Sequence, residues 1–153
     1  VEQGMAVLER TGVVPVLERL FRAGRPFFGL SAGSIMLASR WIRWEDPDDD
    51  STAGLFPCLG FAPVLADMHG EADGWIELVA LLGLEADGTV GYGIPSGAGL
   101  RVGPDGAVAA LAAPVLHFNG KLFKESSSDG YSLLLTTAQI DQLIAAARAN
   151  WRS

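Results

Sequence analysis

The chain has 153 residues, of which 49% are hydrophobic and 19% are charged, a composition typical of one globular domain and not of a disordered protein. Its net charge of -7 argues against nucleic acid as a partner, because phosphate binding needs a basic patch. The single cysteine excludes an intrachain disulfide and a cysteine-rich metal site, and no apolar run reaches the roughly 20 residues that a membrane span requires. No signal peptide is visible, so the sequence predicts a cytoplasmic protein without a cofactor.

The first part of the chain predicts two helices, a strand and a third helix in succession. Residues 4–8 predict a short helix, and residues 13–22 predict an amphipathic helix with Pro15 in its first turn, where the missing N–H costs nothing. Residues 27–30 predict a short buried strand, and residues 32–41 predict the helix that follows it. This alternation is typical of an α/β sheet with parallel strands.

The second part of the chain is rich in short strands. Strands are predicted at residues 62–65, 90–95, 115–118 and 130–135, a helix at 71–84, a hairpin of 99–102 with 107–111, and a last helix opening at Thr137. The acidic residues between positions 45 and 50 predict a solvated turn around Pro47. Their spacing lacks the central glycine and the closing glutamate of an EF-hand.

The segment Gly29-Leu30-Ser31-Ala32-Gly33 fits the loose pattern G-x-S-x-G. In that pattern the serine sits on a tight turn between a strand and a helix, with its hydroxyl exposed, and acts as a nucleophile. Alone the pattern is weak, because the same small residues serve equally well to pack a helix closely against a strand.

A serine nucleophile needs a histidine base, and the sequence contains two histidines. His69 follows a predicted strand in a glycine-flanked loop, at the sheet edge where ligands bind in open α/β folds and where Ser31 is also expected. His117 lies in an alternating stretch that is typical of a strand interior, so His69 is the favoured base. The carboxylate that orients the base stays open among Glu45, Asp46, Asp67 and Glu71.

Three segments resemble the peptidase E and cyanophycinase family of serine peptidases. They are residues 24–34 (GRPFFGLSAGS), 59–69 (LGFAPVLADMH) and 91–97 (GYGIPSG), which follow the family's order at nearly its spacing. The resemblance implies a flavodoxin-like three-layer sandwich with a mostly parallel sheet, to which this chain adds a C-terminal β-hairpin and helix. It also implies a fold like that of class I glutamine amidotransferases, with serine in place of cysteine at the turn.

The resemblance also implies a catalytic triad. Ser31 matches the family's nucleophile, and His69 matches its general base. Asp46, fifteen residues after the serine, matches the acidic residue that peptidase E places shortly after the helix. Glu45 and Asp48 are close enough in sequence to compete with Asp46 for that role.

The turn itself is implied to bind the substrate. The N–H of Ala32 matches one oxyanion donor, and Gly29 and Gly33 flank the nucleophile in the same turn. Two departures from the family stand out. The chain begins where the family's glycine-rich loop, which carries the other oxyanion donor, is expected to end, and Ser96 occupies a position that is often acidic in the family.

These observations predict a single truncated α/β hydrolase-type domain over residues 1–153. Its expected activity is that of a serine hydrolase that acts through an acyl-enzyme on small esters or short peptides, without a metal and without nucleic acid or membrane partners. Because the strand at 27–30 would lack its neighbours, its unpaired edge predicts a homodimer. The alternative is a non-catalytic fragment, or a subunit that needs a partner chain to complete the sheet and the oxyanion hole.

Overall fold

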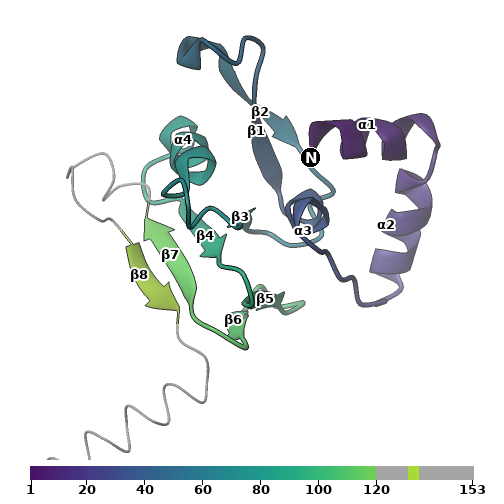
Figure 1. The fold of residues 1–153 in the computed structure, drawn as a ribbon. Helices are drawn as coiled ribbons and strands as arrows, with labels where there is room; N and C mark the ends of the chain where they lie inside the picture. Colours follow the sequence, from purple (N-terminus) through teal and green to yellow (C-terminus); the bar gives the residue numbers. More distant parts are fainter. Residues whose placement is uncertain (120–130, 135–153) are drawn as a thin grey trace, which may run out of the picture.

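The computed structural model describes residues 1–119 and 131–134 of the chain. Its helices are α1 (Glu2–Arg10), α2 (Val14–Arg22), α3 (Ala32–Leu37), the 3-10 turn η1 (Asp50–Thr52) and α4 (Ile76–Leu84). Its strands are β1 (Arg40–Trp44), β2 (Ala53–Pro57), β3 (Leu65–Met68), β4 (Val90–Ile94), β5 (Gly99–Val102), β6 (Val108–Leu111), β7 (Val115–Asn119) and β8 (Tyr131–Leu134). The β1–β2 hairpin projects from the body, and α1 and α2 form a flank on the far side of α3 from the sheet (Figure 1).

The sheet is mixed, which overturns the predicted flavodoxin-like three-layer sandwich with a mostly parallel sheet. The four-stranded sheet has the order β3-β4-β7-β8, and among the described strands β3 and β4 form the one parallel pair. The hairpins β1–β2 and β5–β6 are separate antiparallel pairs. Parallel strands need a crossover connection. α4 supplies one between β3 and β4, whereas the chain passes from β4 to β7 through the β5–β6 hairpin and so returns antiparallel.

Residues 27–30, predicted to be a buried strand, do not form one. Phe28 and Leu30 are 92% and 88% exposed. Phe27 turns inward and contacts Phe61 edge-on, with the ring centroids 4.8 Å apart, and Phe61 stacks on Phe21 of α2 at 4.5 Å. Within the described part of the chain no strand pairs with this segment, and the aromatic cluster packs against it from one side.

The helix predicted at 32–41 ends early, because Ala38 adopts an extended conformation with φ -69° and ψ -179°. Trp41 therefore lies in β1, where it pairs with Phe56 of β2 across the hairpin. Both side chains are buried, and they pack in the same core as Ile35 of α3. The sequence analysis missed this hairpin because the apolar residues after α3 also suit a longer helix, and burial of a cross-strand pair decided the outcome.

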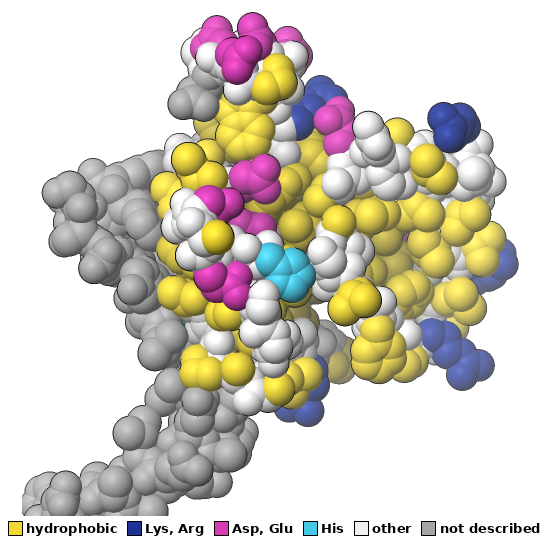
Figure 2. Space-filling model, viewed as in Figure 1, with side chains coloured by type: hydrophobic (Ala, Val, Ile, Leu, Met, Phe, Trp, Pro, Cys, Tyr) yellow, Lys and Arg dark blue, Asp and Glu magenta, His cyan; other side chains and the backbone are white. Residues whose placement is uncertain are grey.

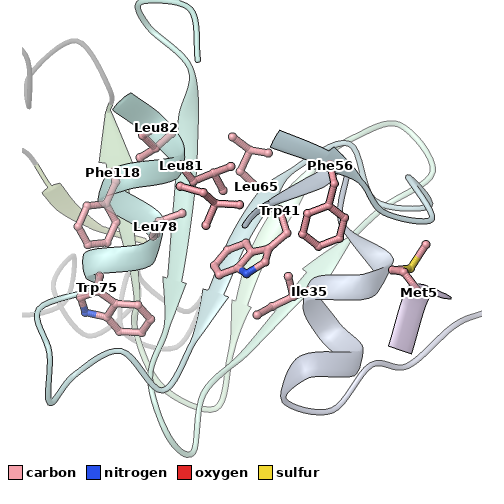
Figure 3. Packing of buried hydrophobic residues seen from close by; sticks show 11 residues of the cluster. Met5, Ile35, Trp41, Phe56, Leu65, Trp75, Leu78, Leu81, Leu82 and Phe118 are labelled. Atoms are coloured by element: carbon pink, nitrogen blue, oxygen red, sulfur yellow. The ribbon is translucent and has the colours of Figure 1, made fainter. Parts of the chain in front are cut away.

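The core lies between α4, the β1–β2 hairpin and the four-stranded sheet (Figure 3). Leu78, Leu81 and Leu82 of α4 are fully buried, and they pack on the parallel pair β3–β4. The helix comes close to the sheet because β4 carries Gly91 at the contact, where a Cβ atom would lie 2.8 Å from Leu78 Cδ1. A larger residue at position 91 would have to displace the ends of the buried Leu78 and Leu82 side chains.

Several local predictions are confirmed. The structure has helices at α1 and α2, strands at β4, β7 and β8, and the hairpin of β5 with β6. The strand predicted at 62–65 overlaps β3 at Leu65 alone, so the strand lies three residues later than predicted. The helix predicted at 71–84 begins only at Ile76, because Trp75 before it has a left-handed backbone. The last predicted helix lies outside the described residues. No helix in the described part of the chain is long and apolar enough to cross a membrane.

Candidate active site

The backbone of Ser31 is strained. Its φ is 51° and its ψ is -128°, a conformation that residues with a side chain rarely adopt and that costs about 1–3 kcal/mol. Ser31 directly precedes α3, and its side chain is exposed. This is the sharp turn into a helix that the G-x-S-x-G pattern predicts, although the segment before it is unpaired.

The turn is tight because two backbone segments touch at Gly29. A Cβ atom at Gly29 would overlap the Cα of Ser34 and would lie 2.6 Å from the carbonyl oxygen of Gly33. Both of these are backbone atoms of the first turn of α3, so they cannot move aside as a flexible side chain would. At Gly33, by contrast, an added Cβ would meet no atom within 4 Å. Gly29 is therefore the residue that makes this turn possible.

The first N–H groups of α3 differ in their partners. The Gly33 N–H donates to the Leu30 carbonyl at 3.0 Å, and the Ser34 N–H donates to the Ser31 carbonyl at 2.8 Å. The Ala32 N–H bonds to no group within the described residues, as expected for a residue that begins a helix. Ala32 therefore keeps the donor that an oxyanion would need, while the N–H of Gly33 is already used.

His69 lies directly after β3, with an exposed side chain and a left-handed backbone of φ 64°. The end of α3 meets the start of β3, where the Ser39 N–H donates to the Val64 carbonyl at 3.0 Å. α3, which follows Ser31, packs against β3, which precedes His69, but within the described residues no hydrogen bond joins Ser31 to His69. Figure 2 shows a histidine at the surface, with acidic side chains next to it.

The structure does not bring Asp46 to His69. Asp46 lies in the loop of the β1–β2 hairpin, where its Oδ1 accepts a hydrogen bond from the Asp48 N–H and its own N–H donates to the Thr52 hydroxyl, both at 3.0 Å. The hairpin carries this loop away from β3 (Figure 1). Glu45 and Asp48 share the loop and its exposure, so none of the three acids nearest to the implied position borders the histidine.

The partner that the structure gives His69 is Ser96, in the turn after β4. The Ser96 hydroxyl oxygen lies 3.1 Å from His69 Nδ1, and the Ser96 N–H donates to Glu71 Oε1 at 2.5 Å. This bond to the Ser96 backbone lowers the pKa of the exposed Glu71 carboxyl. Sequence reasoning missed Ser96 as a contact of the base. The position of Ser96 directly after a predicted strand could have indicated this contact, because the carboxyl ends of neighbouring parallel strands share one edge.

Asp67, another candidate for orienting the base, is buried in β3 with 5% of its surface exposed. Burial raises the pKa of Asp67 to about 6, the hydrogen bond from the Met68 N–H opposes the rise, and the carboxylates of Glu77 and Asp73 add to it. Its Oδ1 accepts that Met68 bond at 2.7 Å. The charge of His69 opposes the rise in the pKa of Asp67, but the side chain within hydrogen-bond distance of the imidazole is that of Ser96.

The raised pKa of Asp67 predicts a pH-dependent stability. The folded protein holds this proton more tightly than the unfolded chain, whose carboxyl has its ordinary pKa of 3.8, so stability falls as pH rises from about 4 to above 6. The loss is at most about 3 kcal/mol. Asp67→Asn keeps an oxygen for the Met68 N–H and removes the charge, so we expect higher stability than wild type at about pH 8 and no gain at about pH 4 in urea unfolding.

Asp105→Asn is the matched control for this prediction, because Asp105 is exposed and its Oδ1 likewise accepts a backbone bond, from the Ala107 N–H at 3.1 Å. We expect this variant to keep the pH dependence of the wild type. An Asp67→Asn protein that loses stability with rising pH as the wild type does would contradict the assignment to Asp67.

Two other features lie away from this edge. A hollow of about 380 Å³ borders the start of β3 and β4 and includes the Arg40–Glu85 ion pair, at 3.3 Å, so it sits at the opposite end of these strands from His69. His117 of β7 is half-buried and stacks on Tyr92, with the rings 5.4 Å apart. The described residues contain no group of side chains that could hold a metal ion.

Comparison with known proteins adds no relative. A scan against protein-family models finds no match, and a search of curated proteins finds none. The resemblance to peptidase E therefore rests on the three segments quoted above, and the function has to be argued from the geometry around Ser31 and His69.

Proposed function

We propose that the protein is a serine hydrolase with Ser31 as the nucleophile and His69 as the base. The observation that carries the proposal is the backbone of Ser31, at φ 51° and ψ -128°, held in place by the close approach of Gly29 to α3. Strain of this kind persists only where the surrounding structure maintains it, and it is concentrated at sites of function. The packing of α3, which follows Ser31, against β3, which precedes His69, supports the proposal.

In the proposed reaction the Ser31 oxygen attacks the carbonyl carbon of the substrate while His69 takes the serine proton. The Ala32 N–H stabilises the negative charge on the carbonyl oxygen. The bond to the leaving group then breaks, His69 returns the proton to it, and the acyl group stays on Ser31. Water, deprotonated by His69, releases the acid and restores the serine.

The substrates that suit this site are small esters, with short peptides as harder substrates. Loss of one oxyanion donor costs about 2.7–4 kcal/mol, which the good leaving group of an activated ester tolerates better than an amide does. In the first turn of α3 the N–H groups of Gly33 and Ser34 are already bonded, which leaves Ala32 as the donor at the start of the helix.

The test is covalent labelling with a fluorophosphonate probe, followed by mass mapping of the labelled peptide. We expect the label on Ser31, no label on Ser31→Ala, and wild-type labelling of Ser34→Ala, which removes a hydroxyl one turn further along α3. Labelling that persists in Ser31→Ala, or hydrolysis of p-nitrophenyl acetate at equal rates by wild type and Ser31→Ala, would overturn the proposal.

The exposure of Phe28 and Leu30 favours a second candidate, a subunit that binds another chain through residues 27–30. Apolar side chains that are 92% and 88% exposed form a surface that promotes association. We propose a homodimer through this surface. Phe28→Ser is expected to shift the protein toward monomer in light scattering after size-exclusion chromatography, whereas Leu111→Ser, at a residue 47% exposed in β6, is not. A wild-type monomer at micromolar concentration would contradict the dimer.

A further inference from the structure

Three residues lie in contact at the edge where β3 and β4 end. His69 Nδ1 lies 3.1 Å from the Ser96 hydroxyl oxygen, and the Ser96 backbone N–H in turn donates to Glu71 Oε1. We propose that the Ser96 hydroxyl positions His69 and that the Glu71 carboxylate holds Ser96 in place through its backbone N–H, an inference that rests on the serine hydrolase proposed above. Ser96 and Glu71 are positioning residues in this scheme, because they act on the base and not on the substrate.

The Ser96 hydroxyl and the imidazole can adopt the arrangement that a base needs. A hydroxyl donates one proton and accepts through its lone pairs, and a neutral imidazole carries its hydrogen on one of its two nitrogens. In the proposed arrangement Nδ1 of His69 carries that hydrogen, and the Ser96 hydroxyl oxygen 3.1 Å away accepts it. The lone pair on Nε2 is then free to take the Ser31 proton.

The same arrangement supplies charge to the base. When Nε2 takes the proton from Ser31, the imidazole becomes an imidazolium, and a carboxylate on the Nδ1 side stabilises it. Glu71, whose charge interacts with that of His69, supplies that carboxylate without a hydrogen bond to the ring. The proton moves from Ser31 to His69 Nε2 and on to the leaving group, and neither Ser96 nor Glu71 gains or loses one.

Backbone bonds hold His69 and Ser96 at one edge. β3 pairs in parallel with β4, with Met68 beside Ile94, so the residues that follow both strands leave the sheet at one edge. The His69 N–H continues this pairing by donating to the Ile94 carbonyl at 3.2 Å. The turn that presents Ser96 is closed by the Ala98 N–H, which donates to the Pro95 carbonyl at 3.0 Å. His69 and Ser96 therefore both follow the ends of paired strands.

The experiment measures which imidazole nitrogen of His69 carries the proton, by 15N NMR at a pH where the ring is neutral. His69→Gln identifies the signals of His69, since the chain has two histidines. We expect the Nδ1–H form to dominate in the wild type and in Ser96→Thr, which keeps the hydroxyl. In Ser96→Ala the Nε2–H form is expected to gain, because no acceptor remains for Nδ1–H. Glu71→Gln is expected to show a smaller shift in the same direction.

Hydrolysis of p-nitrophenyl acetate gives the second readout. Ser96→Ala is expected to lower kcat by about 10- to 100-fold, the loss of one charge-assisted hydrogen bond, with a smaller change in KM and with rescue in Ser96→Thr. Ser51→Ala is the matched control, because Ser51 is likewise exposed and its N–H donates to a carboxylate oxygen, Asp49 Oδ1, at 2.9 Å. We expect this control to keep wild-type kcat.

The two readouts separate this inference from the proposed function. An unchanged tautomer in Ser96→Ala overturns the positioning role, whatever the activity. A tautomer that shifts in Ser96→Ala and returns in Ser96→Thr supports it even if Ser31→Ala shows that the nucleophile lies elsewhere. If the tautomer shifts in Ser96→Ala while kcat stays at the wild-type value, the Ser96 contact does not contribute to catalysis.

Discussion

Replacing Ser31 with glycine is expected to abolish ester hydrolysis and to stabilise the protein at the same time. Glycine adopts a positive φ without steric cost, so Ser31→Gly releases the strain of a backbone at φ 51°. After the greater flexibility of glycine in the unfolded chain is deducted, the expected gain is about 1 kcal/mol in the free energy of unfolding. Loss of the nucleophile is expected to lower kcat at least about 10³-fold. Urea unfolding and p-nitrophenyl acetate hydrolysis measure the two effects.

Ser34→Gly is the control for both effects. Ser34 lies inside α3, where glycine is expected to cost about 0.5–1 kcal/mol and to leave hydrolysis unchanged. A Ser31→Gly variant that is destabilised like Ser34→Gly would show that the turn holds no strain. Hydrolysis at the wild-type rate by Ser31→Gly would show that the serine is not the nucleophile.

Gly29→Ala is expected to disrupt the turn at Ser31. The new Cβ would overlap the Cα of Ser34 and lie 2.6 Å from the Gly33 carbonyl oxygen, so α3 and the segment before it would have to separate. Overpacking against backbone costs about 1–3 kcal/mol or more, and we expect the upper end of that range. The nucleophile would move with the turn, so fluorophosphonate labelling of Ser31 should fall together with the free energy of unfolding.

Gly33→Ala makes the same chemical change four residues later, where an added Cβ meets no atom within 4 Å. Because alanine is the better helix former, this variant is expected to keep the labelling of Ser31 and to gain up to about 1 kcal/mol of stability. Equal behaviour of Gly29→Ala and Gly33→Ala would contradict the steric argument, since the two variants differ in the space around the new methyl group.

The sequence determined the features that depend on neighbours along the chain. Pro15 marks the first turn of α2, and a Gly-Pro-Asp-Gly turn joins β5 to β6. The pattern of small residues around Ser31 predicted the tight turn into α3, which the backbone of Ser31 has. Each of these signals acts within a few residues, so no knowledge of distant contacts was needed.

Only the tertiary structure decided which strands pair and which groups meet. The segment at 27–30 has the apolar residues of a strand, but pairing needs a neighbour that the described residues do not contain. Asp46 follows Ser31 at the spacing that the resemblance implies, yet it lies in the loop of the β1–β2 hairpin, away from β3. Ser96 meets His69 because β3 and β4 pair in parallel and end at one edge. Contacts of this kind join residues far apart in the chain, and burial of the shared core selects among them.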